Sequence, residues 1–177
     1  MHHLVEQILD LNRTNPDIIK GNFQSIDLHS IAQRVTAAAW PSFSQKKQVI
    51  SLAGESVLLP GDEGLIETLL QNLLDNANKY TPEAGEILVT VGTEAGKPFI
   101  RVEDSGPGIP VQEQTHVFER FYRAGSNEDA EASGSGIGLS IVQHIVQLHG
   151  ASINLGNSQF ESGLAVTVEF ESVESSS

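Results

Sequence analysis

The 177-residue chain contains no cysteine, which excludes disulfide bonds, thiolate metal ligands and a thiol nucleophile. This absence agrees with a reducing compartment, and we expect a cytoplasmic setting. The chain also lacks an apolar run near the roughly 20 residues that a membrane helix needs. Residues 1–20 have neither a basic start nor an uninterrupted apolar segment, so they do not resemble a secretion signal.

Cations are scarce as well, since 10 Lys and Arg face 23 Asp and Glu and give a formal net charge of -13. Nucleic acid is therefore excluded as a partner, because its phosphates are held by clustered Lys and Arg. An anionic ligand must be held by a few local cations or a metal ion. Lys79, Arg120 and Arg123 are candidates, although for each one taken singly an exposed surface charge is the favoured interpretation. The length and the 39% hydrophobic content fit one domain with its own core.

What the chain does have is a predicted helix over residues 65–82 with two different faces. Asn72, Asn76 and Tyr80 follow one another at four-residue steps with Lys79 between, so they project from one surface. Asparagine is an indifferent helix former, so this pair indicates a bound ligand or metal. A solvated polar face with an Asp75–Lys79 ion pair is the alternative. The apolar stripe on the other face consists of Leu65, Ile66, Leu69, Leu70, Leu73, Leu74 and Ala77.

A second pattern follows two predicted strands, at residues 86–92 and 98–103. It reads Asp104-Ser105-Gly106-Pro107-Gly108-Ile109. Glycines let the backbone approach a flat ligand, while a carboxylate can accept a hydrogen bond from an exocyclic amine. The alternative is an ordinary Gly-Pro turn capped by the acid.

A third pattern begins with the aromatic segment 117–123 and a small, polar segment at 124–133, which we expect to form a mobile loop. Gly134, Gly136 and Gly138 then alternate before a predicted helix over 141–149. Such glycines expose backbone N–H groups at a helix N-terminus, which forms an anion cradle. The spacing disfavours a dinucleotide fingerprint, and the lack of Gly-Lys-Ser/Thr excludes a P-loop. We expect His144 and His149 to be structural or surface residues.

The rest of the chain is organised around these patterns. We expect residues 1–13 to end a longer helix and 14–24 to form a linker, with a frayed tail at 172–177. Residues 25–40 predict a short strand and a helix that is capped by Asp27, ends near Pro41 and turns Ile31, Val35 and Ala38 inward. Residues 48–53 and 56–59 resemble a hairpin, and Asp62 is the expected cap of the 65–82 helix. Gly150 is expected to end the last helix, and two strands are predicted to follow it at 151–155 and 164–170.

Taken in order, Asn-x-x-x-Asn, Asp-x-Gly-x-Gly, an aromatic segment, a loop and Gly-x-Gly-x-Gly-Leu resemble the ATP-binding catalytic domain of bacterial two-component sensor histidine kinases. The resemblance covers residues 25–170 and extends to the gyrase, Hsp90 and mismatch-repair ATPases. Quorum-sensing-type kinases are the narrower likeness. It implies an α+β fold, a two-layer sandwich in which three helices cover a mixed, mostly antiparallel sheet. Its domains would be residues 1–13 as the end of the dimerisation helix, a linker, and the ATP-binding domain over 25–171.

The resemblance also implies roles for individual residues. Asn76 would coordinate Mg²⁺ bridging the phosphates of ATP, with Asn72, Lys79 and Tyr80 on the phosphate side. Asp104 would accept a hydrogen bond from the adenine amino group, and Gly106, Gly108 and Ile109 would leave room for the ring. The phosphates would lie in a cradle under a lid at 124–133, with Arg120 and Arg123 as partners of the γ-phosphate. The cradle residues are Gly134, Ser135, Gly136, Ile137, Gly138 and Leu139.

Finally, the resemblance indicates the reaction. Hydrolysing relatives carry glutamate at the position of Asn72, and an amide cannot be a general base, so phosphoryl transfer to a histidine is favoured. That histidine should lie on a dimerisation hairpin that is not recognisable in this sequence, and the other partner would be a response regulator. The fragment would be monomeric or weakly dimeric, within a homodimeric protein of the bacterial inner membrane. Alternatives are an ATPase, a non-catalytic nucleotide-binding module and an anti-sigma-type serine kinase. Gly163-Leu164, where relatives have Gly-Thr, is a departure from the pattern.

Overall fold

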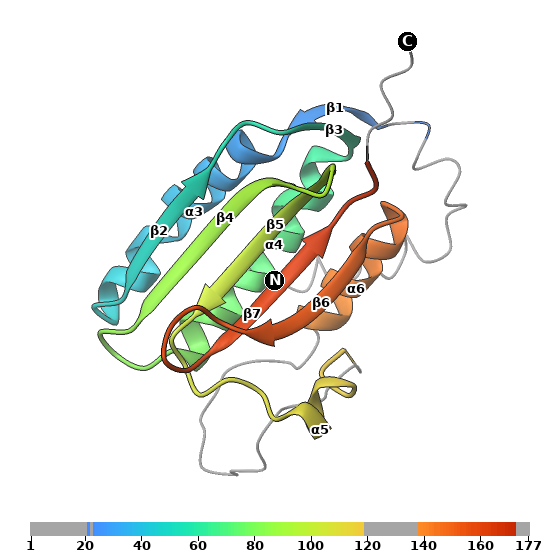
Figure 1. Cartoon of the computed structure of the whole chain (residues 1–177). Helices are drawn as coiled ribbons and strands as arrows, with labels where there is room; N and C mark the ends of the chain where they lie inside the picture. Colours follow the sequence, from blue (N-terminus) through green and yellow to red (C-terminus); the bar gives the residue numbers. More distant parts are fainter. Residues whose placement is uncertain (1–20, 22, 119–137, 173–177) are drawn as a thin grey trace.

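The computed structural model describes residues 21, 23–118 and 138–172, and a five-stranded sheet forms one layer of the fold (Figure 1). The strand order is β2-β4-β5-β7-β6, with β2 parallel to β4 and every other neighbouring pair antiparallel. A separate antiparallel pair is formed by β1 (Gln24–Asp27) and β3 (Leu58–Gly61). The strands of the large sheet are β2 (Val49–Gly54), β4 (Glu86–Glu94), β5 (Lys97–Asp104), β6 (Ser152–Asn157) and β7 (Leu164–Glu169).

Three helices form the second layer and cover one face of this sheet (Figure 1). They are α3 (Leu28–Gln45), α4 (Glu63–Tyr80) and α6 (Gly138–Leu148), and a short helix, α5 (Val111–Gln114), follows β5. The predicted α+β two-layer sandwich is thus confirmed. None of the helices in the described part of the chain has the length and apolar content that crossing a membrane requires.

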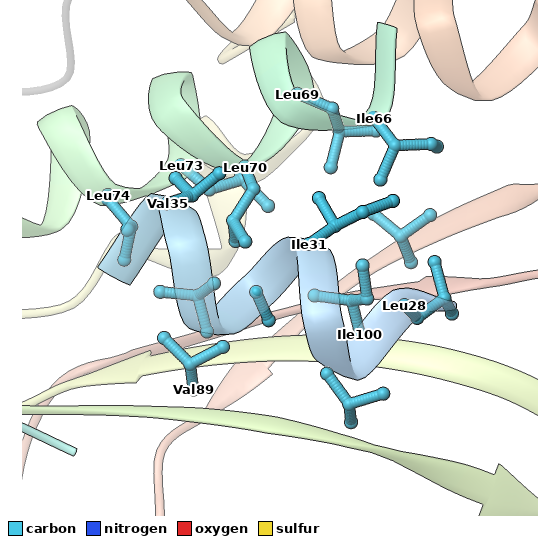
Figure 2. Packing of buried hydrophobic residues seen from close by; sticks show 14 of the residues in the cluster. Leu28, Ile31, Val35, Ile66, Leu69, Leu70, Leu73, Leu74, Val89 and Ile100 are labelled. Atoms are coloured by element: carbon cyan, nitrogen blue, oxygen red, sulfur yellow. The ribbon is translucent and has the colours of Figure 1, made fainter. Parts of the chain in front are cut away.

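The core lies between the two layers, and α4 is its centre. Figure 2 shows side chains of α3 and α4 meeting above Val89 and Ile100 of the sheet. Six of the seven apolar residues predicted on the α4 stripe are buried, and Leu65 is partly buried. Each large aliphatic side chain removed from water in this way contributes about 1.5–3 kcal/mol, so the stripe fixes which face of α4 points away from the sheet.

Both predicted N-caps are confirmed. The Asp27 carboxylate accepts from the His29 N–H at 3.0 Å, and the Asp62 carboxylate accepts from the Leu65 N–H at 3.0 Å. These bonds satisfy N–H groups that have no partner within the helix. The starts of α3 and α4 are therefore set by single acidic residues.

Three predictions about the first half of the domain were wrong, two of them on α3. The helix does not end at Pro41 but continues to Gln45. Proline removes the bond to the carbonyl of Ala37, and both residues are exposed, so water can satisfy that carbonyl. Ala38 is also exposed, and Phe43 on the added turn is buried instead.

The predicted hairpin over residues 48–59 is not formed. Its first strand, β2, pairs in parallel with β4, while its second strand, β3, pairs with β1. The chain leaves β2 at Gly54, whose φ of 113° is rarely adopted by other residues. Gly54 also lies so close to β4 that a Cβ there would be 1.7 Å from the Val91 carbonyl oxygen, so only glycine fits at this position.

Candidate functional site

The Asn face of α4 meets the N-terminus of α6. A Cβ added to Gly138, the first residue of α6, would lie 3.3 Å from Asn72 Oδ1 and 3.7 Å from Asn76 Oδ1. A side chain at residue 138 would therefore crowd the amides. The backbone N–H groups of a helix N-terminus carry a partial positive charge, so this junction combines amide groups with a site suited to an anion.

The two asparagines are not equivalent. Asn72 donates from Nδ2 to the Thr68 carbonyl of its own helix at 2.8 Å, which leaves Oδ1 directed to Gly138. Asn76 instead places both of its amide atoms within 3.8 Å of the Cβ position at Gly138. Asn72 is therefore oriented by the helix, whereas the Asn76 amide faces the junction itself.

The other two predicted residues of α4 lie at its last turn. The Lys79 ammonium is 5.2 Å from the centre of the Tyr80 ring, and the Tyr80 side chain is exposed. The Tyr80 carbonyl oxygen lies close to Gly106, 2.9 Å from where a Cβ would be. The C-terminal end of α4 thus touches the loop after β5, which joins the second sequence pattern to the first.

Two residues of the α3–β2 connection hold this turn in place. Lys46 donates to the carbonyls of Asn78 and Thr81 at 2.5 and 3.1 Å. Gln48 is buried and donates to the same two carbonyls at 3.1 and 2.7 Å, while its oxygen accepts from the Asn78 amide at 2.8 Å. These bonds satisfy the carbonyls that every helix leaves open at its C-terminus.

Asp104 is the last residue of β5 and is buried. Its Oδ1 accepts from the N–H of Gly106 at 2.9 Å and from the N–H of Leu164 at 3.2 Å. Burial raises the pKa of this carboxyl, and the two backbone donors partly offset that effect. The two bonds to Oδ1 thus fix the orientation of the carboxylate, whereas its burial disfavours the charged form.

Glycines surround Asp104 wherever the backbone comes close. A Cβ at Gly163 would lie 1.7 Å from the Asp104 carbonyl oxygen, and the φ of Gly163 is 130°. Gly108, at φ 75°, packs against the Gly163 carbonyl, with 3.2 Å to a Cβ position. Both positions therefore exclude other residues on steric and conformational grounds. The partly buried Ile109 follows and accepts at its carbonyl from Gln114 at 3.0 Å.

The structure thus brings nine predicted residues to one side of the domain, on α4, after β5 and at the start of α6. They are Asn72, Asn76, Lys79, Tyr80, Asp104, Gly106, Gly108, Ile109 and Gly138, and Leu139 follows in the first turn of α6. The predicted residues outside the described part of the chain are Arg120, Arg123, Gly134, Ser135, Gly136 and Ile137, together with the 124–133 lid.

Sequence reasoning missed Lys46 and Gln48, because a buried glutamine that caps a distant helix leaves no periodic signal. It noticed Leu164 only as the residue that replaces threonine. The structure shows that residue 164 contributes its backbone N–H to Asp104, which any residue except proline can do.

The donors fit a magnesium ion that arrives with a phosphate ligand. Among the described residues, no group of three or more His, Asp or Glu side chains could hold a metal ion. An all-protein cage is therefore absent from that part of the chain. Mg²⁺ prefers oxygen ligands and keeps several waters, so one amide oxygen such as that of Asn76 is sufficient when phosphates supply the other ligands.

Comparison with known proteins gives a family match over residues 61–174, to the family described as "Histidine kinase-, DNA gyrase B-, and HSP90-like ATPase". The sensor protein kinase PmrB of Pseudomonas aeruginosa is 37% identical over 165 residues, which is 93% of this chain and 34% of PmrB. The chain therefore spans about a third of the length of that curated relative.

Solved structures give the same result. The mycobacterial sensor histidine kinase MprB matches with a TM-score of 0.72 and 27% identity, over 84% of this chain and 96% of the MprB chain. The cytoplasmic segment of histidine kinase QseC matches with a TM-score of 0.67 and 26% identity, over 97% of this chain and 92% of that one. The domain fold thus has counterparts among histidine kinases.

Proposed function

Because this chain belongs to the family of histidine kinase-, DNA gyrase B- and HSP90-like ATPases, we propose that it is the part of a sensor histidine kinase that binds Mg-ATP and presents the γ-phosphate to a histidine. The observation that carries this proposal is the contact of Asn72 and Asn76 with the N-terminus of α6 at Gly138. Amide oxygens, helix N–H groups and a buried carboxylate on one side of the domain match the phosphate and adenine ends of one ligand.

The adenine end is Asp104. Its Oδ1 is occupied by two backbone donors, so Oδ2 is the oxygen we assign to the adenine amino group. Gly106 and Gly108 have no side chains beside this oxygen, which leaves room for a flat ring close to the backbone. A carboxylate cannot donate, so a purine with a keto oxygen in place of the amino group is disfavoured.

The phosphate end is the junction of α4 and α6. We assign Asn76 to Mg²⁺, which when bound supplies positive charge to the phosphate oxygens. Asn72, oriented by its bond to Thr68, lies beside it, and Lys79 carries positive charge at the last turn of α4. The N-terminus of α6 offers N–H groups to the phosphate chain. These groups position the phosphate chain and neutralise its negative charge, which is most of what phosphoryl transfer requires of a protein.

The chemistry of Asn72 supports transfer to a protein histidine over hydrolysis. An amide has no basic form near neutral pH, so it cannot deprotonate a water molecule. The acceptor histidine, its dimerisation hairpin, a cognate response regulator and a homodimeric full-length protein at the inner membrane complete the proposal. Residues 1–13 as the end of the dimerisation helix, and the likeness to quorum-sensing-type kinases, stay predictions.

Binding is tested by titrating the chain with a non-hydrolysable ATP analogue in the presence of Mg²⁺. Asn76→Ala and Asp104→Ala should each weaken the affinity by at least about tenfold, the factor given by 1.4 kcal/mol. Thr90→Ala is the matched control, since Thr90 lies in the middle of β4, remote from these residues, and pairs with Arg101. Wild-type affinity in both site variants would contradict the proposed binding site.

Transfer is tested by mixing the chain with a separately prepared dimerisation hairpin of a related kinase and radiolabelled ATP. The account predicts an acid-labile phosphohistidine on the hairpin and little phosphate release by the chain alone. Sustained ATP hydrolysis without the hairpin would favour an ATPase. Tight nucleotide binding without either product would favour a non-catalytic module.

A further inference from the structure

The turn between β6 and β7, residues 158–163, lies beside the end of β5 (Figure 1). Gln159, Glu161 and Ser162 of the turn are exposed, and its one large apolar residue, Phe160, is only partly buried. It is closed internally by bonds from the Ser158 N–H to the Gly163 carbonyl at 3.3 Å and from the Ser158 hydroxyl to the Ser162 carbonyl at 3.1 Å. Beyond the pairing of β7 with β6 and with β5, its position depends on side-chain bonds from β5.

Two consecutive residues of β5 supply these bonds. Glu103 Oε1 accepts from the Gln159 N–H at 3.0 Å, near the start of the turn. Asp104 Oδ1 accepts from the Leu164 N–H at 3.2 Å, immediately after the turn. Successive side chains of a strand point to opposite faces, so the turn is held from both sides of the sheet.

Glu103 is unusual for an acidic residue on the uncovered face of the sheet. It is only 8% exposed, and it lines a groove of about 390 Å³ together with Arg101, Thr167 and Gln159. Arg101 is engaged elsewhere, with Thr167 at 3.0 Å and Glu94 at 3.2 Å. A buried carboxylate is costly unless its oxygens accept hydrogen bonds, and the described partner of Glu103 is the N–H of Gln159.

A role for this bond follows from how closely the turn touches Asp104. Gly163 packs so tightly on the Asp104 carbonyl that a Cβ would lie 1.7 Å from the oxygen, and the next residue donates one of the two bonds to Asp104 Oδ1. A shift of the turn would therefore move a donor away from this carboxylate. A hydrogen bond to a charged group is directional and loses strength quickly when its geometry changes.

We propose that Glu103 is a positioning residue for adenine recognition: by anchoring Gln159 it holds the β6–β7 turn, and hence the Leu164 N–H, against Asp104. This inference rests on the proposed function, in which Asp104 accepts from the adenine amino group. Glu103 itself does not touch the nucleotide. It acts from the opposite face of β5.

The test is the preference of the chain for a non-hydrolysable ATP analogue over the corresponding inosine nucleotide, measured by titration with Mg²⁺. Glu103→Gln keeps an oxygen that accepts from Gln159 and should retain wild-type affinity and preference within about threefold. Glu103→Asp keeps the charge but is one methylene too short, and Glu103→Ala has no acceptor. Both should bind the ATP analogue about tenfold more weakly, with a smaller loss for the inosine nucleotide.

Glu94→Ala is the matched control, because Glu94 is an acid on the same strand pair whose only described side-chain bond is to Arg101. It should leave the preference unchanged. A general loss of stability lowers the melting temperature without changing the preference of the molecules that remain folded. If Glu103→Ala does not fold, the comparison of Glu103→Asp with Glu103→Gln decides.

Unchanged preference in Glu103→Asp and Glu103→Ala, or an equal loss in Glu103→Gln, would overturn the inference and leave the proposed function standing. A wild-type chain that binds neither nucleotide, or does not distinguish them, would overturn the proposed function and this inference together. The two failures are thus separated by the behaviour of the wild-type chain.

Discussion

Among the single residues of the domain, some polar side chains are buried, which opposes folding but holds each side chain in one orientation. Asp104 is buried with a raised pKa, so its ionised form is less favourable in the folded chain than in water. His149 is a second case. It donates from Nδ1 to the Ile145 carbonyl at 2.9 Å and accepts at Nε2 from the Asp62 N–H at 3.1 Å. We propose that Asp104 serves a ligand, whereas His149 joins the end of α6 to the start of α4.

Asp104→Asn should separate the effect of the buried charge on stability from its effect on nucleotide binding. Since the folded pKa of Asp104 is raised, the charge costs stability at pH values above the unfolded pKa near 3.8, and the neutral amide removes that cost. Its oxygen can still accept from Gly106 and Leu164. We expect a melting temperature equal to or above that of the wild type at pH 7, and at least about tenfold weaker binding of the ATP analogue, because an NH₂ group would face the adenine amine. A lower melting temperature together with unchanged affinity would contradict this.

His149 should make stability depend on pH in the mildly acidic range. Burial lowers its pKa, so the folded chain holds it neutral while the unfolded chain protonates near pH 6.5. Its stabilising contribution is complete above about pH 6.5 and is lost as the pH falls from there through the lowered folded pKa. His149→Phe retains a ring to stack on Phe23, which lies 4.7 Å away, but cannot be protonated.

Urea unfolding between pH 7.5 and 5 measures this effect. The free energy of unfolding should fall less steeply in His149→Phe than in the wild type over this range. His116→Gln, at an exposed site after α5, is the control and should follow the wild type. Parallel curves for the wild type and His149→Phe would show that protonation of His149 does not oppose folding.

At the scale of elements, α4 is fixed at both ends and presents its asparagines from a rigid axis. Its start is capped by Asp62 and joined to α6 through His149, and its end is held by Lys46 and Gln48. The apolar stripe of the helix sets the rotation about its axis. Preorganisation of this kind lowers the cost of ordering the site when a ligand binds.

Gln48→Ala should loosen the end of α4. It leaves the Asn78 and Thr81 carbonyls with Lys46 as their side-chain donor, and the net contribution of a lost hydrogen bond is about 0.5–1.5 kcal/mol. We expect the free energy of unfolding to fall by about that amount, and ATP-analogue affinity to fall severalfold because Lys79 and Tyr80 lie on the loosened turn. The exposed Gln45→Ala is the control. An equal effect of both substitutions would mean that the buried cap has no special importance.

The sequence predicted elements whose pattern is local, and it missed contacts that only the folded chain creates. The two-faced helix was recognisable from residues such as Leu69 and Asn76, because one helical period governs both faces. The pairing of β2 with β4 was not recognisable, since the residues of a short apolar strand do not indicate which strand it will pair with. Likewise, Asp104 was singled out by its glycines, whereas the anchoring bond from Gln159 to Glu103 joins residues 56 positions apart.

At the scale of the whole molecule, a chain with a net charge of -13 is proposed to bind an anion. Long-range forces oppose the approach of Mg-ATP, and only short-range groups favour its binding. The site compensates locally, with helix N–H groups, neutral amides and Lys79. This arrangement predicts different effects of salt on the association and on the bound state.

The association rate constant for the Mg-ATP analogue should rise as the salt concentration increases from about 0.01 M to about 0.15 M, since the Debye length falls from roughly 30 Å to roughly 8 Å. Stopped-flow mixing measures it. Uncharged adenosine is the control and should associate at a rate that salt does not change. A rate for the analogue that falls with salt would instead indicate steering by local cations.

We propose above that α4, the end of β5 and the start of α6 together bind one nucleotide. A crystal structure of the chain with Mg²⁺ and a non-hydrolysable ATP analogue tests it most directly. We expect to find the adenine amino group within hydrogen-bond distance of Asp104, and Asn76 on the metal beside the phosphates at Gly138. A nucleotide bound elsewhere on the domain, with Asp104 and Asn76 touching neither ring nor metal, would contradict it.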